Sequence, residues 1–338
     1  MQDPIESAVA RLRAGNLVAI PTETVYGLAA DASNAEAVRK IFQAKNRPPT
    51  HPLIVHIPHP CRSGMSASEK EAAWAALLSQ WSRDVPQEAL TLAVKFWPGP
   101  LTLILPKAKG VLPEVTGNQA TVGLRCPDHP LTLRLLERFA GGLAAPSANR
   151  FGRISPTTAD HVRQEFSDRD LMVLDGGPCH VGIESTIVDL TRLSTLGPVI
   201  LRPGMISRQE IETALNLTAS DAPNEPGPRV SGSLSAHYAP RTAMTFAGRL
   251  SAGPEQGSKV AWVHFPGTER PRSLHASEVT EVILPASPDA LARSLYALLR
   301  DLDGGGFDLI CLEDLPPDSR WDAIRDRLLR AVNGSGQA

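Results

Sequence analysis

The chain has 338 residues, enough for two domains that each bury a hydrophobic core. Its 42% hydrophobic and 21% charged residues are typical of a soluble globular protein, and no apolar run approaches the roughly 20 residues of a membrane span. The net charge of -2 argues against a broad nucleic-acid-binding face.

The N-terminal stretch MQDPIESAVARLRAG predicts an amphipathic helix and lacks the basic start and apolar centre of a secretory signal. We therefore expect a cytoplasmic protein. The cysteines are far apart and form no C-x-x-C pair, which argues against a zinc site and against a disulfide framework. We expect reduced thiols at Cys61, Cys126, Cys179 and Cys311.

Helical and extended patterns alternate along the first half of the chain. They predict a helix at Ile5–Arg13, a strand at Leu17–Ile20, a helix at Asn34–Ala44, a strand at Leu53–Ile57 and one outer helix over Ser66–Leu90. The alternation continues through apolar segments at 100–106, 121–127, 171–177 and 184–190, with a helical pattern at 129–140. This rhythm predicts an α/β sheet.

The composition changes after residue 217, where Pro, Gly, Ser and Asn dominate. We expect a first domain at 1–217, a linker at 218–240 and a second, smaller α/β domain at 241–338. Gly304–Gly306 follow a helical pattern and precede a strand, so they predict a helix end and not a phosphate-binding loop. No P-loop motif occurs anywhere in the chain.

The stretch PTETVYGLAAD follows the strand that ends at Ile20. Pro21 ends the strand, and the hydroxyls of Thr22 and Thr24 and the ring of Tyr26 would then lie at a strand's carboxyl edge, the usual ligand position in open α/β sheets. An equally weighted alternative is a capped turn with no ligand and with Glu23 in solvent.

Two cations, Lys45 and Arg47, lie two residues apart at the end of a predicted helix. Cations favour a helix C-terminus whatever the function, yet this spacing in an irregular segment also suits a di- or triphosphate. His56 ends a predicted strand and faces either the core or a cleft.

The densest polar run in the chain spans residues 144–162. Ser147 and Asn149 directly follow an apolar strand, and a helix opens soon after with Ser155 or Thr157 as its expected N-cap. Hydroxyls, an amide and cations beside a helix start suit phosphate oxygens, although a long capped turn is the alternative. Further along, Ser185 stands at a strand entrance and Arg202 at a strand end, where an arginine usually has an anionic partner.

Taken in order, these segments resemble the threonylcarbamoyl-AMP synthase family in its longer two-domain form. The resemblance runs almost continuously over residues 19–204 through PTETVYGL, KNRP, HPLIVHI, FWPGPLT, TVGLRCPDHP, APSAN, SPTTADHV, GIESTIVDL and LRPG, and it includes HYAP in the linker. It implies a YrdC-like twisted mixed sheet with flanking helices, followed by a smaller Rossmann-like α/β domain.

The resemblance implies a nucleotidyltransferase that joins L-threonine, bicarbonate or CO2, and ATP into threonylcarbamoyl-AMP and pyrophosphate, for threonylcarbamoyladenosine formation in tRNA. Such chemistry needs positioned cations and a polyphosphate-bound metal, which agrees with the lack of an obvious acid–base pair. Mg²⁺ is expected to arrive with ATP, without a dedicated protein-built metal site. A downstream machinery would pass the product to tRNA, so direct tRNA binding by this chain is expected to be weak or absent.

Matching positions assign site residues by resemblance. Threonine would be held by Thr24, Tyr26, His56, Arg125, the Ala145 backbone and Ser185. ATP would be held by Lys45, Arg47, His51, Thr121, Ser147, Asn149, Ser155, Arg202 and Ser235, with Lys45 and Arg47 as the catalytic cations on the phosphates.

Two positions depart from the family pattern. His51 stands where the family often has Asn, and Ser235 stands where an aromatic residue is expected in the linker. As a hypothesis, the linker folds over the ATP cleft and excludes water from a labile carbamate-phosphate.

Three other functions remain open at this stage. They are an RNA-binding module on the same fold without catalysis, a carbamoyl transfer like that of hydrogenase-maturation relatives, and the same reaction on another amino acid.

Overall fold

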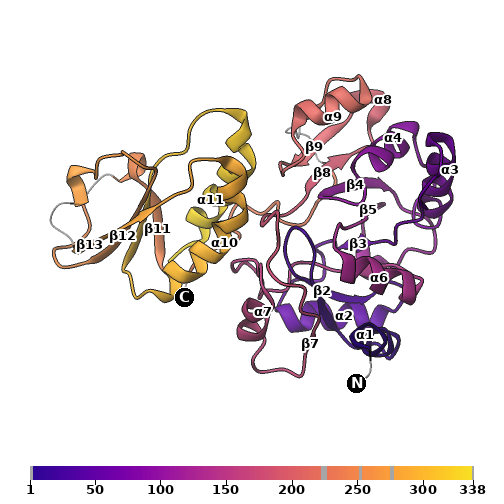
Figure 1. Cartoon of the computed structure of the whole chain (residues 1–338), viewed down its shortest axis with the longest axis horizontal. Helices are drawn as coiled ribbons and strands as arrows, with labels where there is room; N and C mark the ends of the chain where they lie inside the picture. Colours follow the sequence, from indigo (N-terminus) through magenta and orange to yellow (C-terminus); the bar gives the residue numbers. More distant parts are fainter. Residues whose placement is uncertain (1–2, 222–226, 251–252, 275–277, 337–338) are drawn as a thin grey trace. The chain divides into compact units, whose positions relative to one another are not determined.

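The structure, a computed structural model, describes residues 3–221, 227–250, 253–274 and 278–336. It divides into two compact units, one of residues 1–151 with 156–233, the other of residues 152–155 with 234–338 (Figure 1). The linker expected at 218–240 thus divides between the units after Ser233, and its residues 222–226 lie outside the described residues.

Within the described part of the first unit, ten strands form one mixed sheet in the order β10-β9-β8-β4-β5-β3-β6-β2-β1-β7. They are β1 Val18–Ile20, β2 Gly27–Asp31, β3 Ile54–His56, β4 Leu101–Pro106, β5 Thr121–Arg125, β6 Leu143–Ala144, β7 Met172–Val173, β8 Thr186–Asp189, β9 Val199–Arg202 and β10 Ser220–Asp221. Strands β3 and β5 are parallel, whereas β4 is antiparallel to β5 and parallel to β8. The ends of β3 and β5 therefore meet the starts of β4 and β8 at one edge.

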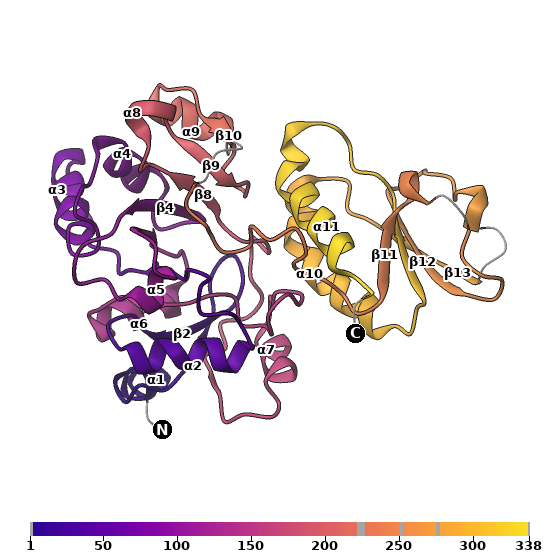
Figure 2. The ribbon, with the colours of Figure 1, turned by 180° about the vertical axis from the view of Figure 1, so that it is seen from behind.

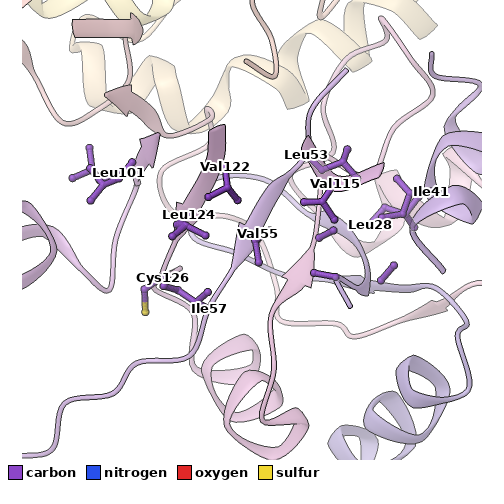
Figure 3. Close-up of a cluster of buried hydrophobic side chains, with 14 of the residues drawn as sticks. Leu28, Ile41, Leu53, Val55, Ile57, Leu101, Val115, Val122, Leu124 and Cys126 are labelled. Carbon is purple, nitrogen blue, oxygen red and sulfur yellow. The ribbon is translucent and has the colours of Figure 1, made fainter. Parts of the chain in front are cut away.

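Helices cover this sheet and supply the rest of its core. They are α1 Pro4–Arg13, α2 Ala35–Lys45, α3 Ala67–Leu78, α4 Gln87–Phe96, α5 Pro113–Thr116, α6 Pro130–Phe139, α7 Ala159–Glu165, α8 Leu193–Leu196 and α9 Arg208–Leu215. Figure 3 shows Leu28, Val55 and Leu124 of the sheet in one cluster with Ile41 of α2. Each such side chain contributes about 1.5–3 kcal/mol on burial. The core therefore fixes the sheet edge at which β3 and β5 end and β4 and β8 begin.

The single helix expected over Ser66–Leu90 is wrong, because two helices, α3 and α4, lie side by side there (Figure 2). The chain turns between them, where the Ser82 hydroxyl donates to the carbonyls of Asp84 and Pro106, and Pro86 directly precedes α4. A proline at that position cannot extend a preceding helix.

The N-cap expected at Ser155 or Thr157 is also displaced. Helix α7 begins after Thr158, whose side chain accepts the backbone N–H of His161. The Thr157 hydroxyl instead contacts the His161 ring at 3.4 Å. Neighbouring threonines are equivalent as caps, so only the backbone conformation selects between them.

In the second unit, the described residues form a four-stranded parallel sheet in the order β11-β14-β12-β13. Its elements are β11 Ala243–Phe246, β12 Lys259–His264, β13 Glu278–Ile283, α10 Pro288–Gly304, β14 Leu309–Leu312 and α11 Asp322–Gly334, with short 3-10 turns η1 Ala247–Arg249, η2 Arg272–Leu274 and η3 Ser319–Trp321. Helix α10 ends at Gly304, as the glycine run predicts. The fold class expected from the sequence is thereby confirmed.

Residues 152–155 are fixed within this second unit. The Arg153 guanidinium pairs with Asp303 of α10 at 3.1 Å, and the backbone N–H of Ala239 donates to the Gly152 carbonyl at 2.9 Å. All four cysteine thiols are free. Within the described ranges, no helix combines the length and apolarity that a membrane crossing would demand.

Candidate active site

The loop after β1 carries a chain of buried hydroxyl groups. Thr22 Oγ1 donates to the carbonyl of Val25 at 2.6 Å and accepts the backbone N–H groups of Thr24 and Val25. Because its one proton is used there, the 2.9 Å contact between the two threonine hydroxyls makes Thr24 the donor. The Thr24 oxygen consequently faces its other neighbours as an acceptor.

Arg125, the last residue of β5, lies next to this chain. Its Nη2 donates to Thr24 Oγ1 at 2.9 Å and lies 2.7 Å from Oε1 of Glu23. The other carboxylate oxygen of Glu23 accepts the backbone N–H of Asp128 at 3.0 Å. Glu23 is 1% exposed, so the alternative that placed it in solvent is wrong. An ion pair and a backbone donor together offset the cost of burying its charge.

His56 and Ser185 extend this polar cluster. His56 ends β3 opposite Arg125 in register and is buried. Burial, followed by the positive charge of Arg125, lowers the His56 pKa to about 3, so its ring is neutral at neutral pH. The Ser185 hydroxyl, just before β8, forms a 2.7 Å hydrogen bond with the hydroxyl of Thr102 on β4.

Two other residues expected to hold threonine are partly occupied by the protein itself. The Tyr26 hydroxyl donates to the Gly177 carbonyl at 2.8 Å and accepts the backbone N–H of Gly176, and burial raises its pKa to about 12. The backbone N–H of Ala145 donates to the Ile54 carbonyl at 3.0 Å. The Tyr26 hydroxyl and the Ala145 backbone N–H are therefore already engaged by the protein.

Lys45 is the last residue of α2 and is 1% exposed. Its Nζ donates to the Ser147 carbonyl at 2.6 Å and also to the Asn149 carbonyl. Burial, and then the positive charge of Arg47, holds the pKa of Lys45 well below its usual 10.5. The Lys45 ammonium and the backbone of the Ser147–Asn149 turn thus belong to one small cluster.

Arg47 and Arg202 converge on Ser231, although they come from distant segments. Arg47 Nη2 donates to the Pro52 carbonyl at 3.0 Å and to the Ser231 hydroxyl at 3.3 Å. Arg202, at the end of β9, donates from Nη1 to the Ser231 carbonyl at 2.9 Å. Its Nη2 donates to the carbonyl and the hydroxyl of Ser185 at 2.9 and 3.1 Å. Ser185 therefore links Arg202 to Thr102 and so to the strand edge that carries Arg125.

Residues 227–233, called the strap below, lie across the first unit beside Thr121. Val230 is buried against Ile104 and Ile187, and the backbone N–H of Arg229 donates to the Gln119 side chain at 2.7 Å. The cavity lined by Thr121 and the strap measures only about 10 Å³. Such a volume holds no more than about one water molecule, so the strap fills this space.

The remaining expected nucleotide residues are His51, Ser155 and Ser235. The His51 ring packs edge-on against Phe151 at 5.4 Å, and burial lowers its pKa, as does the charge of Arg47 to a smaller degree. Ser155 and Ser235 fall in the second unit, where Ser155 is buried and Ser235 is exposed.

Glu23, Thr102 and Ser231 belong to this cluster but are missing from the residues selected by sequence. Glu23 lies between Thr22 and Thr24, and at that position the sequence is equally consistent with a solvent-exposed carboxylate and with a buried one. Thr102 is the one polar residue of the apolar run LTLIL, which is a usable signal of a polar partner. Ser231 lies in a linker whose composition gives no such signal.

Comparison with known families divides the chain in two. A model of the Sua5, YciO and YrdC family, described as "Telomere recombination", matches residues 10–204. A second model, described as "Threonylcarbamoyl-AMP synthase, C-terminal domain", matches residues 206–332.

Individual relatives align over nearly the whole chain. The threonylcarbamoyl-AMP synthase of Bacillus subtilis is 36% identical, over 98% of this chain and 94% of the relative. That of Pyrococcus abyssi is 36% identical, over 97% and 93%. The crystal structure of P. abyssi Sua5 complexed with L-threonine superposes with a TM-score of 0.81 at 34% identity, over 99% of this chain and 96% of that one.

Proposed function

The chain belongs to the threonylcarbamoyl-AMP synthase family, and on this premise we propose that it makes threonylcarbamoyl-AMP from L-threonine, bicarbonate or CO2, and ATP. The observation that carries the proposal is the position of Ser185. Its hydroxyl joins Arg202, on the side of the proposed phosphate-binding cations, to Thr102 of β4, the strand that pairs with β5, which ends at Arg125. A carbamate made on an amino acid must reach a phosphorus atom, so adjacent sites for the two substrates are required.

At the amino-acid end, we assign the substrate carboxylate to Arg125 and the amino group to the acceptor oxygen of Thr24. The hydroxyl chain supports this assignment because it leaves Thr24 as an acceptor. His56 beside them is neutral and adds no second charge to the pocket.

The amine of threonine attacks the carbon of CO2, or of bicarbonate with loss of water, and gives up a proton to form a carbamate. A carbamate oxygen then attacks the α-phosphorus of ATP, and the bond to the pyrophosphate leaving group breaks. Lys45, Arg47 and Arg202 are the cations on which the triphosphate would lie, with Ser147, Asn149 and Thr121 beside them. Positioned cations stabilise the charge that develops on the leaving group.

Mg²⁺ would enter with ATP and supply further charge neutralisation on the phosphates. Lys45 is held by the backbone carbonyls of Ser147 and Asn149, not by a carboxylate ligand set, which fits a metal held mainly by phosphate oxygens. No group of three or more His, Cys, Asp or Glu that could hold a metal ion occurs in the described ranges.

The strap would cover the nucleotide and keep water from the carbamate-phosphate product. Its buried Val230 and its bonds to Arg47 and Arg202 support this role. Both arginines now donate to Ser231, so phosphate oxygens would replace those contacts when ATP binds.

The product would pass in the cytoplasm to a separate machinery that transfers the threonylcarbamoyl group to tRNA. The names of the relatives favour this synthase function over an RNA-binding module without chemistry.

The deciding experiment is pyrophosphate release from ATP and bicarbonate with each of the twenty amino acids, without tRNA. We expect release with L-threonine alone, accompanied by threonylcarbamoyl-AMP in the mass spectrum. A signal of equal size with serine or valine would refute the threonine assignment. Absence of any amino-acid-dependent release would refute the synthase function.

A further inference from the structure

We propose that Glu23 is a positioning residue that fixes the Arg125 guanidinium and the Thr24 hydroxyl for the amino-acid substrate. The inference rests on the proposed function and deepens its amino-acid site. Its basis is the buried contact of Glu23 Oε1 with Arg125 Nη2 at 2.7 Å, beside the Thr24 hydroxyl at 2.9 Å from the same nitrogen.

Three anchors hold Glu23 in place. Its Oε2 accepts the backbone N–H of Asp128 at 3.0 Å, its backbone carbonyl accepts the N–H of Val181 at 2.7 Å, and its Oε1 meets Arg125. Oε2 is held by a hydrogen bond, whereas Oε1 is held by the ion pair alone and forms no hydrogen bond with a described residue. A carboxylate held in these two ways does not swing aside when a ligand arrives. Glu23 therefore stays bound to Arg125 when the substrate arrives, and the substrate's carboxylate does not displace it.

Glu23 directs which edge of Arg125 remains for the substrate. Because Nη2 serves Glu23 and Thr24, the remaining donors are Nη1 and Nε, and Nε is buried with no hydrogen-bond partner. A buried donor without a partner is costly, so it marks where an acceptor belongs. The substrate carboxylate is the acceptor of matching charge.

The charge of Glu23 also sets the net charge of the pocket. Glu23 and Arg125 together are neutral, and a zwitterionic amino acid is neutral as well. Without the carboxylate, a buried guanidinium beside a neutral imidazole would attract any small anion. Glu23 thus favours amino acids over simple carboxylates.

The test is L-threonine binding by titration calorimetry, without ATP, to the wild-type protein, Glu23→Gln and Glu23→Asp. We expect the threonine Kd to rise about tenfold or more in Glu23→Gln, because a charge-assisted contact that orients Arg125 is lost. Steady-state assays should show a matching rise of KM for threonine, whereas KM for ATP stays within about twofold.

Asp189→Asn is the matched control. Asp189 is also fully buried, pairs with Arg192 at 3.0 Å and accepts a backbone N–H, yet it lies on β8 away from Arg125. We expect this variant to lose thermal stability without a change in the threonine Kd. If Glu23→Gln behaves in the same way, the positioning role is overturned.

Glu23→Asp keeps the experiment decisive where Glu23→Gln does not fold, because it retains the charge. Its shorter side chain should raise the threonine Kd by a smaller factor, and an unchanged Kd in the folded protein would overturn the role. A wild-type protein without threonine-dependent pyrophosphate release would contradict the proposed function itself. A wild-type protein that is active while its Glu23 variants bind threonine normally would contradict only this inference.

Discussion

Arg125 and Lys45 are two buried cations in the first unit, and the protein surrounds them differently. Arg125 has a carboxylate within 2.7 Å, from Glu23. Lys45 donates to two backbone carbonyls and forms no ion pair with any described residue. Arg125 is thus ion-paired before a ligand arrives. Lys45 feels the carboxylates of Glu165 and Glu184 without an ion pair to either.

The difference matches the ligands that we assign to the two cations. A zwitterionic amino acid brings no net charge, so a neutral pocket suits it. A triphosphate brings several negative charges, and a buried lysine that is not ion-paired gains more from them than one that already is. The pKa of Lys45, lowered mainly by burial, agrees with the absence of an ion pair.

The largest effect is expected from Lys45→Met, which removes the charge and keeps the aliphatic chain. Pyrophosphate release should fall about 1,000-fold in kcat/KM for ATP, because a cation on the developing phosphate charge is lost. The check is steady-state kinetics beside circular dichroism. Full activity in a folded variant would remove Lys45 from the phosphate site.

Arg125→Lys should come second, with KM for threonine raised about 100-fold. A lysine has no planar fork, so it cannot serve Glu23, Thr24 and a substrate carboxylate together. KM for ATP, measured in the same assays, is the internal control. An equal rise in both constants would mean that the two cations act on one ligand.

ATP binding should be coupled to proton uptake at Lys45. The pKa of Lys45 in the ATP-free protein is lowered, and bound phosphates would raise it. Between these two pKa values, ATP affinity falls as pH rises, by at most about tenfold per pH unit. Calorimetry in two buffers of different ionisation enthalpy measures the uptake. Lys45→Met should abolish it, and identical heats in both buffers for the wild type would contradict it.

The smallest effect concerns His56, whose pKa falls from about 6.5 to about 3 on folding. Below pH 6.5 the unfolded chain takes up a proton that the folded chain refuses, so the free energy of unfolding drops as pH falls. The drop is about 1.4 kcal/mol per pH unit inside that window.

Urea unfolding at pH 7.5, 6.5 and 5.5 tests this dependence. His56→Gln should lose less stability than the wild type between pH 6.5 and 5.5. Parallel curves for the two proteins would show that His56 is not a neutral buried group.

Much of the fold followed from the sequence because its signals are local. Helix α2, for example, has an Asn34 cap and an apolar stripe, and both are readable from neighbouring residues. The division of Ser66–Leu90 into two helices was missed, because the Ser82 bond to the Pro106 carbonyl that fixes the turn comes from a distant strand.

Most of the candidate site residues were selected from recognisable motifs, and the structure brings several of them into one cluster. His56 and Arg125 end neighbouring strands, Thr24 is hydrogen-bonded to Arg125, and Lys45 contacts the Ser147–Asn149 turn. The ion-pair partner of Glu23 could not be predicted from the sequence, because that partner, Arg125, lies 102 positions away in the chain.

By itself the sequence determined the fold class, most of the elements, the family and the residue types that a triphosphate and an amino acid require. Only the tertiary structure decided which charges are ion-paired, since the pairing of Glu23 with Arg125, and of Lys45 with carbonyls, arises from strands and turns that meet on folding. The physical reason is that electrostatic energy depends on distance and burial in space, and neither is encoded by position along the chain.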